Sequence, residues 1–223
     1  MLRLERTAIS NWEGALRGMR NPMNSWDRSD TRYDVWDYTP VGHDNVLVIS
    51  PKIGPNDLDL MKRLAAGGPV HAKYRRQIFV SVDVTAPLYW WKEFDTYKVG
   101  TVANSCSTMH KIHAKEFSRE DFSCDRMDEG GLIMLDQVIA YLESERQKFL
   151  ADKNDKQSWH NMIQTLPTSF NQMRTVTFSY ENLVSIYQYR CNHKLAEWHT
   201  FCDWILSLPY AAEVILTSTK ENT

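Results

Sequence analysis

The stretch between positions 86 and 111, APLYWWKEFDTYKVGTVANSCSTMHK, holds the residue types best suited to binding chemistry. Its first part is aromatic, with Tyr89, Trp90 and Trp91 in a row, which is typical of a buried wall. Its second part, from Gly100 to Thr108, is small and hydroxylated. Small residues let a ligand approach backbone N–H groups, and hydroxyls and amides supply donors and acceptors. The stretch indicates either a ligand site or a helix end followed by an ordinary polar loop.

A second candidate is an arginine on the apolar side of a predicted C-terminal helix. Ser179 can cap this helix, and Glu181 lies near its positive end. Arg190 follows Leu183 by seven residues, which places it within roughly 20° of the apolar stripe on a helix of 3.6 residues per turn. An inward arginine is costly unless it meets an anion. The partner is either a carboxylate of this chain or a bound carboxylate or phosphate.

The common catalytic motifs are absent: the sequence has no P-loop, G-x-G-x-x-G, G-x-S-x-G or H-E-x-x-H. We expect His110 and His113 to share a helix face, and His199 and Cys202 likewise, but neither pair has further ligands at metal-binding spacing. Cys106 lies in the polar segment without an identifiable activating base. We therefore assign no metal ligand and no catalytic nucleophile.

Apolar periodicity predicts the elements that hold these residues. The predicted strands cover 45–50 and 77–87, and the predicted helices before the C-terminal one cover 57–66, 132–153 and 157–164. We expect Asn56 to cap the first of these helices and Gly67 to close it. The acidic segment from Ser118 to Gly131 is predicted to be a loop.

Length and composition limit the class of protein. A chain of 223 residues can form one large domain or two small ones, and we predict a single domain over 1–223. Residues 1–40 are polar, so we expect an N-terminal extension or arm with at most a short amphipathic helix. With 43% hydrophobic and 24% charged residues the chain is globular, and a net charge of -2 argues against a dedicated nucleic-acid binder.

The cysteines and the absence of long apolar runs bear on the compartment. Four widely spaced cysteines form no C-x-x-C pair and no disulfide pattern. The sequence has no signal peptide and no apolar run long enough to cross a membrane. We therefore expect a cytoplasmic protein with free thiols and no membrane partner.

Two stretches read together resemble the flavin-dependent thymidylate synthases. In that family a strand ending in Ala-Pro leads to Gln-Trp-x-Arg-His-Arg and then to Ser-x-Asn-Glu-x-Ser-x-Arg-Tyr, and positions 85–111 are similar to this signature. Positions 179–205 are similar to the family's C-terminal helix, which has the pattern Asn-Leu-x-x-hydrophobic-x-x-x-Arg. The resemblance covers roughly residues 40 to 215.

The resemblance implies roles for individual residues. Asn104 and Ser107 match the family's Asn and second Ser, Thr101 replaces the first Ser, and Arg190 matches the helix arginine that contacts the nucleotide. The implied nucleotide-binding residues are Arg190, Ser107, Ser105, Lys98 and Glu93. The implied flavin-binding residues are Asn104, Tyr97, Thr101, His193 and Lys194.

The sequence departs from the family signature at its charged positions. Thr96-Tyr97-Lys98 stands where the family has Arg-His-Arg, so one of three positions stays cationic. Glu93 replaces the family's Gln, Ser105 its Glu, and Met109-His110 its Arg-Tyr pair. A lysine replaces a guanidinium fork only as a point charge, so anion recognition is weakened. Tyr97 either stacks on a ring where the family has histidine or is a core tyrosine.

The resemblance also implies a fold, an activity and an assembly. The fold would be α/β (α+β), with a small central sheet flanked by long helices. The activity would be the methylation of dUMP to dTMP with methylenetetrahydrofolate, FAD and NADPH, in a homotetramer with active sites between subunits. One alternative is a non-catalytic or repurposed member that binds a nucleotide or acts on another pyrimidine. Another is an unrelated assembly protein whose aromatic residues serve an interface.

Overall fold

The computed structural model describes residues 2–42 and 46–218, so the predicted start of a strand at Asn45 lies outside the described residues. The chain forms two compact units, each made of several segments. Unit 1 comprises Met1–Arg3, Val84–Thr96 and Asn104–Arg174, and unit 2 comprises Leu4–Asp83, Tyr97–Ala103 and Thr175–Thr223. The predicted single domain over 1–223 stays a prediction.

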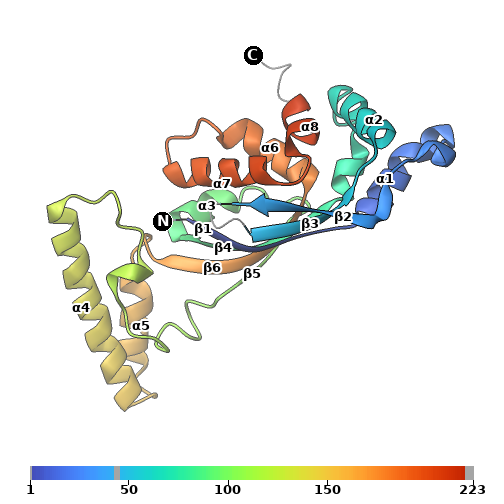
Figure 1. The fold of residues 1–223 in the computed structure, drawn as a ribbon. Coiled ribbons are helices and arrows are strands. Elements are labelled where there is room, and N and C mark those ends of the chain that lie inside the picture. The colour runs from blue at the N-terminus through green and yellow to red at the C-terminus, as the bar shows by residue number, and fades with distance from the viewer. Residues whose placement is uncertain (1, 43–45, 219–223) are drawn as a thin grey trace. The chain divides into compact units, whose positions relative to one another are not determined.

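The strands form one four-stranded sheet and one hairpin (Figure 1). The sheet has the order β1-β4-β6-β5, and β2 pairs antiparallel with β3. The strands are β1 (Arg3–Ser10), β2 (Arg32–Val41), β3 (Val46–Lys52), β4 (Phe79–Pro87), β5 (Val102–Ser105) and β6 (Asn171–Ser179). The alternation predicted for β4 is confirmed, because Val80, Val82 and Val84 are buried whereas Phe79 is 42% exposed.

Helices account for most of the remaining regular structure, and the predicted α/β class with a small sheet is confirmed. The α-helices are α1 (Trp12–Arg20), α2 (Pro55–Ala66), α3 (Leu88–Phe94), α4 (Glu129–Ala151), α5 (Lys156–Thr165), α6 (Tyr180–Arg190), α7 (Ala196–Ser207) and α8 (Ala211–Val214). Single 3₁₀ turns cover Asn21–Met23, Trp26–Arg28, Lys73–Arg76, Arg119–Asp121 and Leu216–Ser218. No described helix is long and apolar enough to cross a membrane.

The N-terminal segment is more structured than its sequence predicts. β1 is a strand of the four-stranded sheet, and α1 follows it with Trp12 and Leu16 buried. Sequence reasoning missed β1 because its residues alternate poorly: most are partly or fully exposed, and only Thr7 within the strand is buried. The expected role of residues 1–40 as an arm stays a prediction.

The predicted N-cap of α2 is wrong. Gly54 is the N-cap and Pro55 takes the first helical position, where its missing N–H costs nothing. The carboxylate of Asp30, from a preceding segment of unit 2, accepts the N–H groups of Asn56 and Asp57 at 2.9 and 3.1 Å. A Cβ at Gly54 would lie 2.3 Å from this carboxylate, so only glycine fits. A cap supplied by a distant residue leaves no local sequence signal.

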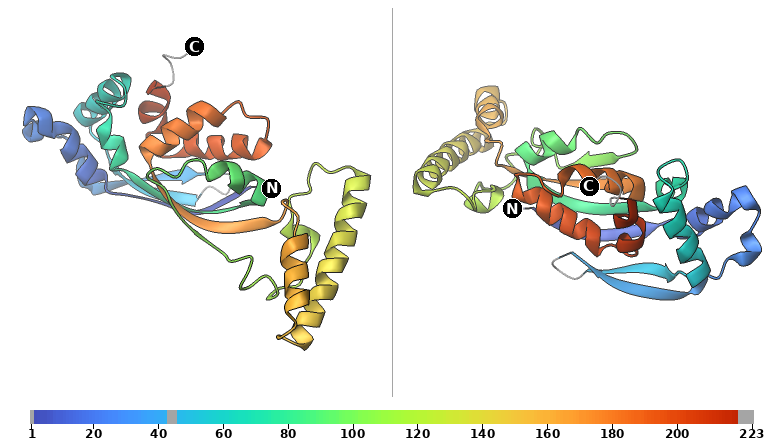
Figure 2. Two further views of the ribbon diagram at one scale, coloured as in Figure 1. Left: turned by 180° about the vertical axis from the view of Figure 1, so that it is seen from behind. Right: turned by 90° about the horizontal axis from the view of Figure 1, so that it is seen from above.

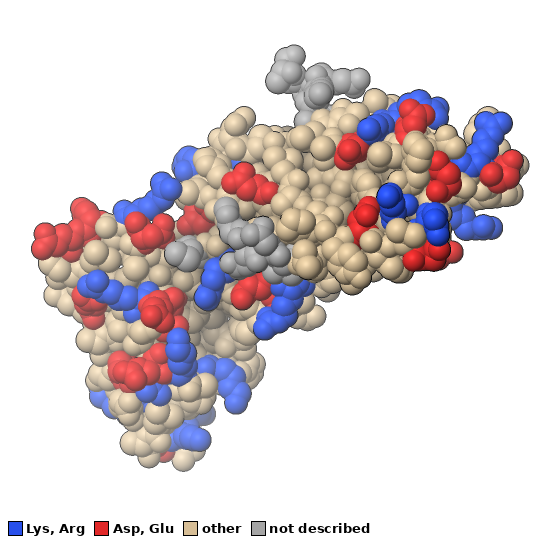
Figure 3. All heavy atoms as spheres, in the orientation of Figure 1, with Lys and Arg blue, Asp and Glu red and all other residues tan. Residues whose placement is uncertain are grey.

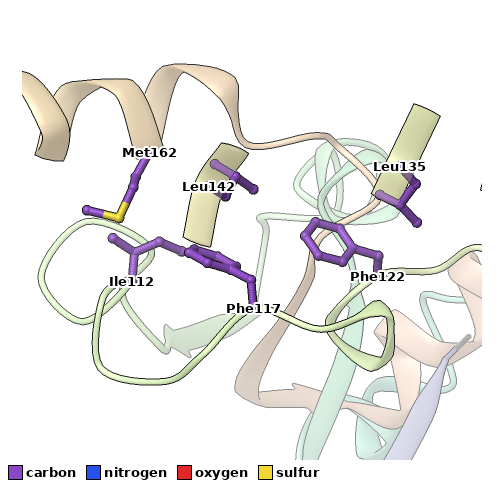
Figure 4. Close-up of a cluster of buried hydrophobic side chains, with 6 residues drawn as sticks. All are labelled: Ile112, Phe117, Phe122, Leu135, Leu142 and Met162. Carbon is purple, nitrogen blue, oxygen red and sulfur yellow. The ribbon is translucent and has the colours of Figure 1, made fainter. Parts of the chain in front are cut away.

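Unit 1 is organised around an apolar cluster beneath the α4–α5 hairpin (Figure 4). Met162 of α5 points toward Ile112, and Leu142 of α4 lies over Phe117. The fully buried Leu142 confirms the apolar stripe predicted for this helix. The predicted helix through His110 and His113 is wrong, because Ser107 Oγ accepts the N–H groups of residues 109 and 110 in a turn instead.

In unit 2 the helices α6 and α7 lie side by side (Figure 2), and α7 contributes Phe201 and Trp204 to an aromatic core. Phe178, Phe201 and Trp204 pack with ring centroids 5.2–6.3 Å apart, and Trp204 Nε1 donates to Thr7 Oγ1 at 3.0 Å. The predicted cap of α6 is confirmed, since Ser179 accepts the N–H of Asn182. The C-terminal segment forms two helices, because α6 ends at Arg190 and α7 runs from Ala196 to Ser207.

Candidate functional site

The loop of residues 97–103, which precedes β5, is held against α6 within unit 2. Asn182 donates Nδ2 to the carbonyl of Val99 at 2.7 Å, and Thr101 Oγ1 donates to the carbonyl of Tyr97 at 2.5 Å. Gly100 lies between them with φ +76°, a left-handed conformation that favours glycine. A Cβ at Gly100 would lie 3.4 Å from Asn182 Oδ1. Hydrogen bonds and one glycine therefore set the shape of this loop.

Asn182 has a second role at the start of α6. Its Oδ1 accepts from the backbone N and the hydroxyl of Ser179 at 2.9 and 2.8 Å, which completes a capping box. One side chain thus caps the helix with its oxygen and holds the loop with its nitrogen. Sequence reasoning used Asn182 only as part of a pattern and assigned it no contact, since the loop it holds is some eighty residues away in sequence.

Tyr97 and Arg190 meet in a cluster of aromatic rings in unit 2, which we call the aromatic cluster (Tyr97, His193 and Trp198). Arg190 Nε donates to the Tyr97 hydroxyl at 2.9 Å. The guanidinium carbon lies 4.9 Å from the ring centre of Trp198 and 5.5 Å from that of Tyr97. Trp198 is fully buried, and its ring lies edge-on to the rings of Tyr97 and His193, with centroids 6.1 and 6.3 Å away.

Arg190 is the last residue of α6, and its guanidinium packs against aromatic rings. Arg190 is partly exposed, so the inward position predicted from the stripe is confirmed in part. An arginine that stacks on aromatic rings keeps its charge and is restrained in orientation, which suits recognition of a planar or tetrahedral anion. Whether its anion is internal or bound stays a prediction.

The segment between α6 and α7 is also fixed by hydrogen bonds. His193 Nδ1 accepts the N–H of Leu195 at 3.2 Å, and its carbonyl bonds to His199 Nε2 at 2.6 Å. Lys98 and Lys194, the two lysines in the predicted site, are both exposed. Both ammonium groups are therefore accessible to the phosphate of a ligand.

The remaining predicted site residues lie in unit 1. Asn104 and Ser105 are exposed on β5, and within the described chain their side chains make no hydrogen bond. Glu93 is partly exposed on α3, where its carbonyl accepts from Thr96. Ser107 Oγ bonds to His110 Nδ1 at 2.9 Å as well as holding its own turn. Exposed amide and hydroxyl groups at Asn104 and Ser105 are available to a ligand.

A groove of about 420 Å³ opens beside Ser107 in unit 1. Phe117 and Phe170 contribute apolar surface, while Thr85 and Lys111 contribute a hydroxyl and a cation. A groove of this size and lining suits a ligand with an apolar part and a negative charge. Sequence reasoning singled out Ser107 but not the aromatic residues, which lie on segments distant in sequence.

Arg174 is an organising residue that sequence reasoning missed. Its guanidinium carbon lies 4.2 Å from the ring centre of Trp91, and its Nη1 donates to Asp95 Oδ1 at 2.8 Å. Trp91 Nε1 donates to the carbonyl of Gln172 at 2.8 Å. The buried wall predicted from the aromatic run is confirmed, because Trp90 and Trp91 are at most 1% exposed.

The thiols and histidines form no metal site in the described residues. All four cysteines are free, and Cys202 is buried. Burial raises the pKa of the Cys202 thiol to about 12, so it stays protonated at neutral pH. Among residues 2–42 and 46–218 no three His, Cys, Asp or Glu side chains converge in a way that could hold a metal ion.

The structure therefore divides the predicted site between the two units. In unit 2 it brings Tyr97 into contact with Arg190 and Thr101, and His193 into the same aromatic cluster. The predicted residues in unit 2 are Tyr97, Lys98, Thr101, Arg190, His193 and Lys194, and those in unit 1 are Glu93, Asn104, Ser105 and Ser107.

No protein-family model matches the sequence. No curated protein sequence matches it either. Solved structures do match. Thymidylate synthase X from Helicobacter pylori, crystallised with FAD and dUMP, shares 14% identity with a TM-score of 0.64, over 99% of each chain. A second structure of that enzyme with FAD and dUMP gives a TM-score of 0.62 at 14% identity, over 96% of this chain and 97% of the other.

A third match has a different activity in its name. The UMP/dUMP methylase PolB from Streptomyces cacaoi, bound with 5-Br dUMP, shares 11% identity with a TM-score of 0.58, over 99% of this chain and 93% of the other. At such identities a structural match shows the fold. The resemblance inferred from two short motifs is thus confirmed at the level of the fold, and the chain has the fold of the flavin-dependent thymidylate synthases.

Proposed function

We propose that this protein is a divergent flavin-dependent thymidylate synthase that methylates dUMP to dTMP. The observation that carries the proposal is the hydrogen bond between Arg190 Nε and the Tyr97 hydroxyl. It joins the two stretches on which the sequence resemblance rests, although they are 93 residues apart. Fold neighbours crystallised with FAD and dUMP support the same substrate and cofactor.

The nucleotide phosphate is assigned to Arg190. A guanidinium held against the ring faces of Tyr97 and Trp198 is restrained before the ligand arrives, which lowers the entropy cost of binding. The resemblance also implies Ser107, Ser105, Lys98 and Glu93 as nucleotide-binding residues, of which Lys98 lies in the same unit as Arg190.

The residues fit FAD, though through weaker anion contacts than the family signature provides. Asn104 offers an exposed amide, Tyr97 and His193 offer ring surfaces, and Lys98 and Lys194 offer exposed cations for a pyrophosphate. Thr101 instead uses its hydroxyl to hold the loop. Bound FAD, once reduced by NADPH, would supply the hydride for the reaction.

The overall reaction balances without a protein nucleophile: dUMP, methylenetetrahydrofolate and reduced flavin (FADH2) would give dTMP, tetrahydrofolate and FAD. The C5 proton of the uracil would pass to solvent, and a proton from solvent would complete tetrahydrofolate. The protein's own tasks are to bind the phosphate, orient the uracil and exclude water. By the same resemblance we propose a cytoplasmic homotetramer with active sites between subunits.

An absorbance spectrum of the purified protein tests the cofactor. The protein would be incubated with FAD and desalted, and a retained band near 450 nm, a general property of oxidised flavins, is the expected result. Release of tritium from [5-³H]dUMP, with methylenetetrahydrofolate and NADPH present, then tests the activity. A protein that retains no flavin in excess FAD is not a flavin-dependent enzyme.

Replacing Arg190 tests its role in phosphate binding. We expect Arg190→Ala to abolish dUMP binding measured by calorimetry, and Arg190→Lys to weaken it strongly, because a lysine keeps the charge but loses the guanidinium fork. Circular dichroism and thermal melting serve as controls for folding. If Arg190→Ala lowers stability by several kcal/mol while dUMP still binds, the arginine is a structural ion-pair residue.

A second candidate is a repurposed protein of this fold that binds a nucleotide or acts on another pyrimidine. Thr96 and Tyr97 in place of two cationic residues, and Met109 in place of an arginine, favour it. The neighbour named as a UMP/dUMP methylase has this fold as well. Binding of dUMP or UMP without tritium release from dUMP would support this candidate over the first.

A further inference from the structure

A cleft of about 520 Å³ lies within unit 2, between the β2–β3 hairpin and the C-terminal helices. The hairpin contributes residues 37–40 and Ser50 to its wall, and the end of α7 and most of α8 contribute residues 206–213. Helix α7 packs beside β2, as Figures 1 and 2 show. The volume is in the range of about 300–1,000 Å³ that is typical of small-molecule sites. None of the described lining residues belongs to the proposed nucleotide or flavin set.

The inner face of the hairpin changes from apolar to polar along its length. Val41 and Val48, at the end where β2 finishes and β3 begins, are buried. Further along, Asp37 and Ser50 are paired directly opposite each other in the register, and both line the cleft. Opposite residues of an antiparallel pair have Cβ atoms about 4.5–5.5 Å apart on the same face of the sheet. A carboxylate and a hydroxyl therefore lie side by side in the wall of the cleft.

The hydroxyl of Ser50 lacks a partner within the protein. Ser50 is 0% exposed, and its Oγ makes no hydrogen bond within residues 2–42 and 46–218. A buried hydroxyl without a hydrogen bond carries the full cost of its desolvation, and for this reason most such groups are paired. An unpaired hydroxyl in the wall of a cleft indicates a partner that binds in the cleft.

The carboxylate of Asp37 also has unused capacity to accept hydrogen bonds. Tyr210, just before α8, accepts the N–H of Ile53 and donates its single hydroxyl proton to the carbonyl of Pro51, both at 3.0 Å. The same hydroxyl lies 3.4 Å from Asp37 Oδ2, which is the longer of its two contacts with acceptors. An ionised carboxylate can accept about four hydrogen bonds. Asp37 can therefore accept further donors from a ligand.

The charge of the cleft is negative. Asp37 and Glu213 line it from the hairpin and from α8, and no described lining residue is a lysine, arginine or histidine. Burial contributes most to raising the pKa of the Tyr210 phenol, and the charges of Asp37 and Glu213 raise it as well, so both carboxylates act on this group. In Figure 3 the surface over the middle of β2 and β3 consists mainly of uncharged residues. The cleft therefore favours a cation.

The remainder of the wall favours an organic cation over a metal ion. Leu206, Leu208 and Pro209 contribute apolar surface. Ca²⁺ and Mg²⁺ require a shell of about six or more oxygen ligands, and within the described chain no three His, Cys, Asp or Glu side chains converge as metal ligands. An alkylammonium group instead offers three N–H donors to carboxylates and hydroxyls, and its carbon chain can cover apolar side chains.

We propose that this cleft binds an aliphatic diamine or polyamine, with one ammonium group donating to the Asp37 carboxylate and to Ser50 Oγ. The second carboxylate, Glu213, lies on the other wall and is assigned to a second ammonium group of the same ligand. A charge-assisted hydrogen bond is stronger than one between neutral groups, so the ammonium groups fix the orientation of the ligand. This inference does not depend on the proposed enzymatic function.

Calorimetric titration of the full chain with 1,4-diaminobutane tests the site. One equivalent is expected to bind. 1,4-Butanediol has the same carbon chain with hydroxyls in place of the ammonium groups, and it is expected not to bind, because it lacks the charge that the carboxylates recognise. A wild-type chain that does not bind the diamine overturns the proposal. Mg²⁺ that binds in the cleft more tightly than the diamine, and displaces it, overturns the assignment to an organic cation.

A pair of carboxylate variants locates the bound diamine. We expect Asp37→Asn to raise the dissociation constant at least about tenfold, because a hydrogen bond between charged groups is lost. Asp34→Asn on the same strand is the matched control: Asp34 is exposed, pairs with Arg32, and the change of charge is equal. This control is expected to leave the constant within about twofold of the wild type. Equal losses in the two variants would mean general attraction of a polyamine to an acidic protein and would overturn the proposal.

Ser50→Ala covers the case in which Asp37→Asn does not fold. Because Ser50 Oγ has no hydrogen bond within the described chain, its removal is expected to leave the melting temperature of the free protein unchanged or raise it. Binding of 1,4-diaminobutane is expected to weaken by about threefold or more, because the ligand loses one acceptor. A lower melting temperature with unchanged binding would show that the hydroxyl serves the fold, which overturns its assignment to the ligand.

Discussion

The two units handle charge in different ways. Unit 2 buries an ion pair: Arg20 Nε lies 2.6 Å from Asp57 Oδ1, with side chains 5% and 0% exposed. Both units pack an arginine against an aromatic ring, Arg190 on Trp198 in unit 2 and Arg174 on Trp91 in unit 1. Each ion pair in the described residues of unit 1 keeps at least one side chain 22% or more exposed, and in Arg119–Asp136 both side chains are about half exposed. Its core is a cluster of aliphatic and phenylalanine side chains.

Buried polar contacts and apolar packing contribute to a fold in different ways. A buried polar network is stable only in one arrangement, because each group left unpaired carries the full cost of desolvation. In unit 2 the Arg20–Asp57 pair is part of such a network, and less buried hydrogen bonds hold the segments that carry Tyr97 and Arg190. An apolar core tolerates adjustment and responds to lost volume. Substitutions in the two units should therefore differ in size and kind.

Asp57→Ala is expected to have the largest effect. Asp57 accepts hydrogen bonds from Ser29, Thr31 and Arg20, and its removal leaves Arg20 buried without a carboxylate. Breaking a buried pair on one side costs about 3–5 kcal/mol, measured as the free energy of unfolding in urea. Asp59→Ala, two residues on in the same helix and 66% exposed, is the control and should cost little. Equal losses in the two variants would contradict the comparison.

The same carboxylate predicts an acid-sensitive part of the stability. Burial alone would raise the pKa of Asp57, but hydrogen bonds from Thr31, Ser29 and Arg20 outweigh burial and hold the pKa below its ordinary value. The stabilisation is therefore complete above the ordinary pKa of about 4 and is lost as the pH falls through the lower native pKa. Asp57→Asn should be less stable at pH 7 and lose less on acidification than the wild type.

Leu142→Ala is expected to come next. Leu142 is fully buried in the unit 1 cluster, and a leucine truncated in a core costs about 2–5 kcal/mol through lost transfer energy and a residual cavity. Ile133→Ala on the same helix is the control, because Ile133 is 53% exposed. Unlike the loss in Asp57→Ala, this loss should be nearly independent of pH between 3 and 7. A strong pH dependence would show that charge also organises unit 1.

Much of the fold was predictable from local patterns, and much of the site was not. The alternation of β4, the stripe of α4 and the Ser179 cap are local signals, and each is confirmed. The Asp30 cap of α2 and the Trp91–Arg174 contact join residues far apart in sequence, and no pattern encodes them.

The site illustrates the same limit. The sequence placed Tyr97 and Arg190 in two motifs, but no pattern indicated that the Trp198 ring would lie against both of them. The sequence motif included Asn182 without assigning it a contact, whereas its side chain links the cap of α6 to the loop of residues 97–103. A single sequence also gives no pattern from which to predict that the candidate residues fall in two different units.

Asn182→Asp is expected to have a smaller and more local effect. An aspartate keeps the oxygen that accepts from Ser179 but loses the Nδ2 donor to the Val99 carbonyl. The free energy of unfolding should fall by about 1 kcal/mol, while hydrogen exchange in residues 97–103 accelerates. Ser179→Ala, which removes the cap and leaves the Val99 bond, should cost about 1 kcal/mol without faster loop exchange. Loop exchange unchanged in Asn182→Asp would remove this residue as the anchor of the loop.

Arg119→Ala is expected to have the smallest effect, because it removes an exposed ion pair of unit 1 and not a buried pair such as Arg20–Asp57. Arg119 Nε donates to Asp136 Oδ1 at 2.6 Å, and the hydrogen bond raises the pKa of Arg119 and lowers that of Asp136. Both groups are in contact with solvent, where salt screens their attraction and two long side chains lose freedom on pairing. The melting temperature should match that of the wild type at 1 M NaCl and fall only slightly at low salt. A drop as large as that of Leu142→Ala, persisting at high salt, would mean that this surface pair holds α4 in place and that unit 1 is specified by polar contacts after all.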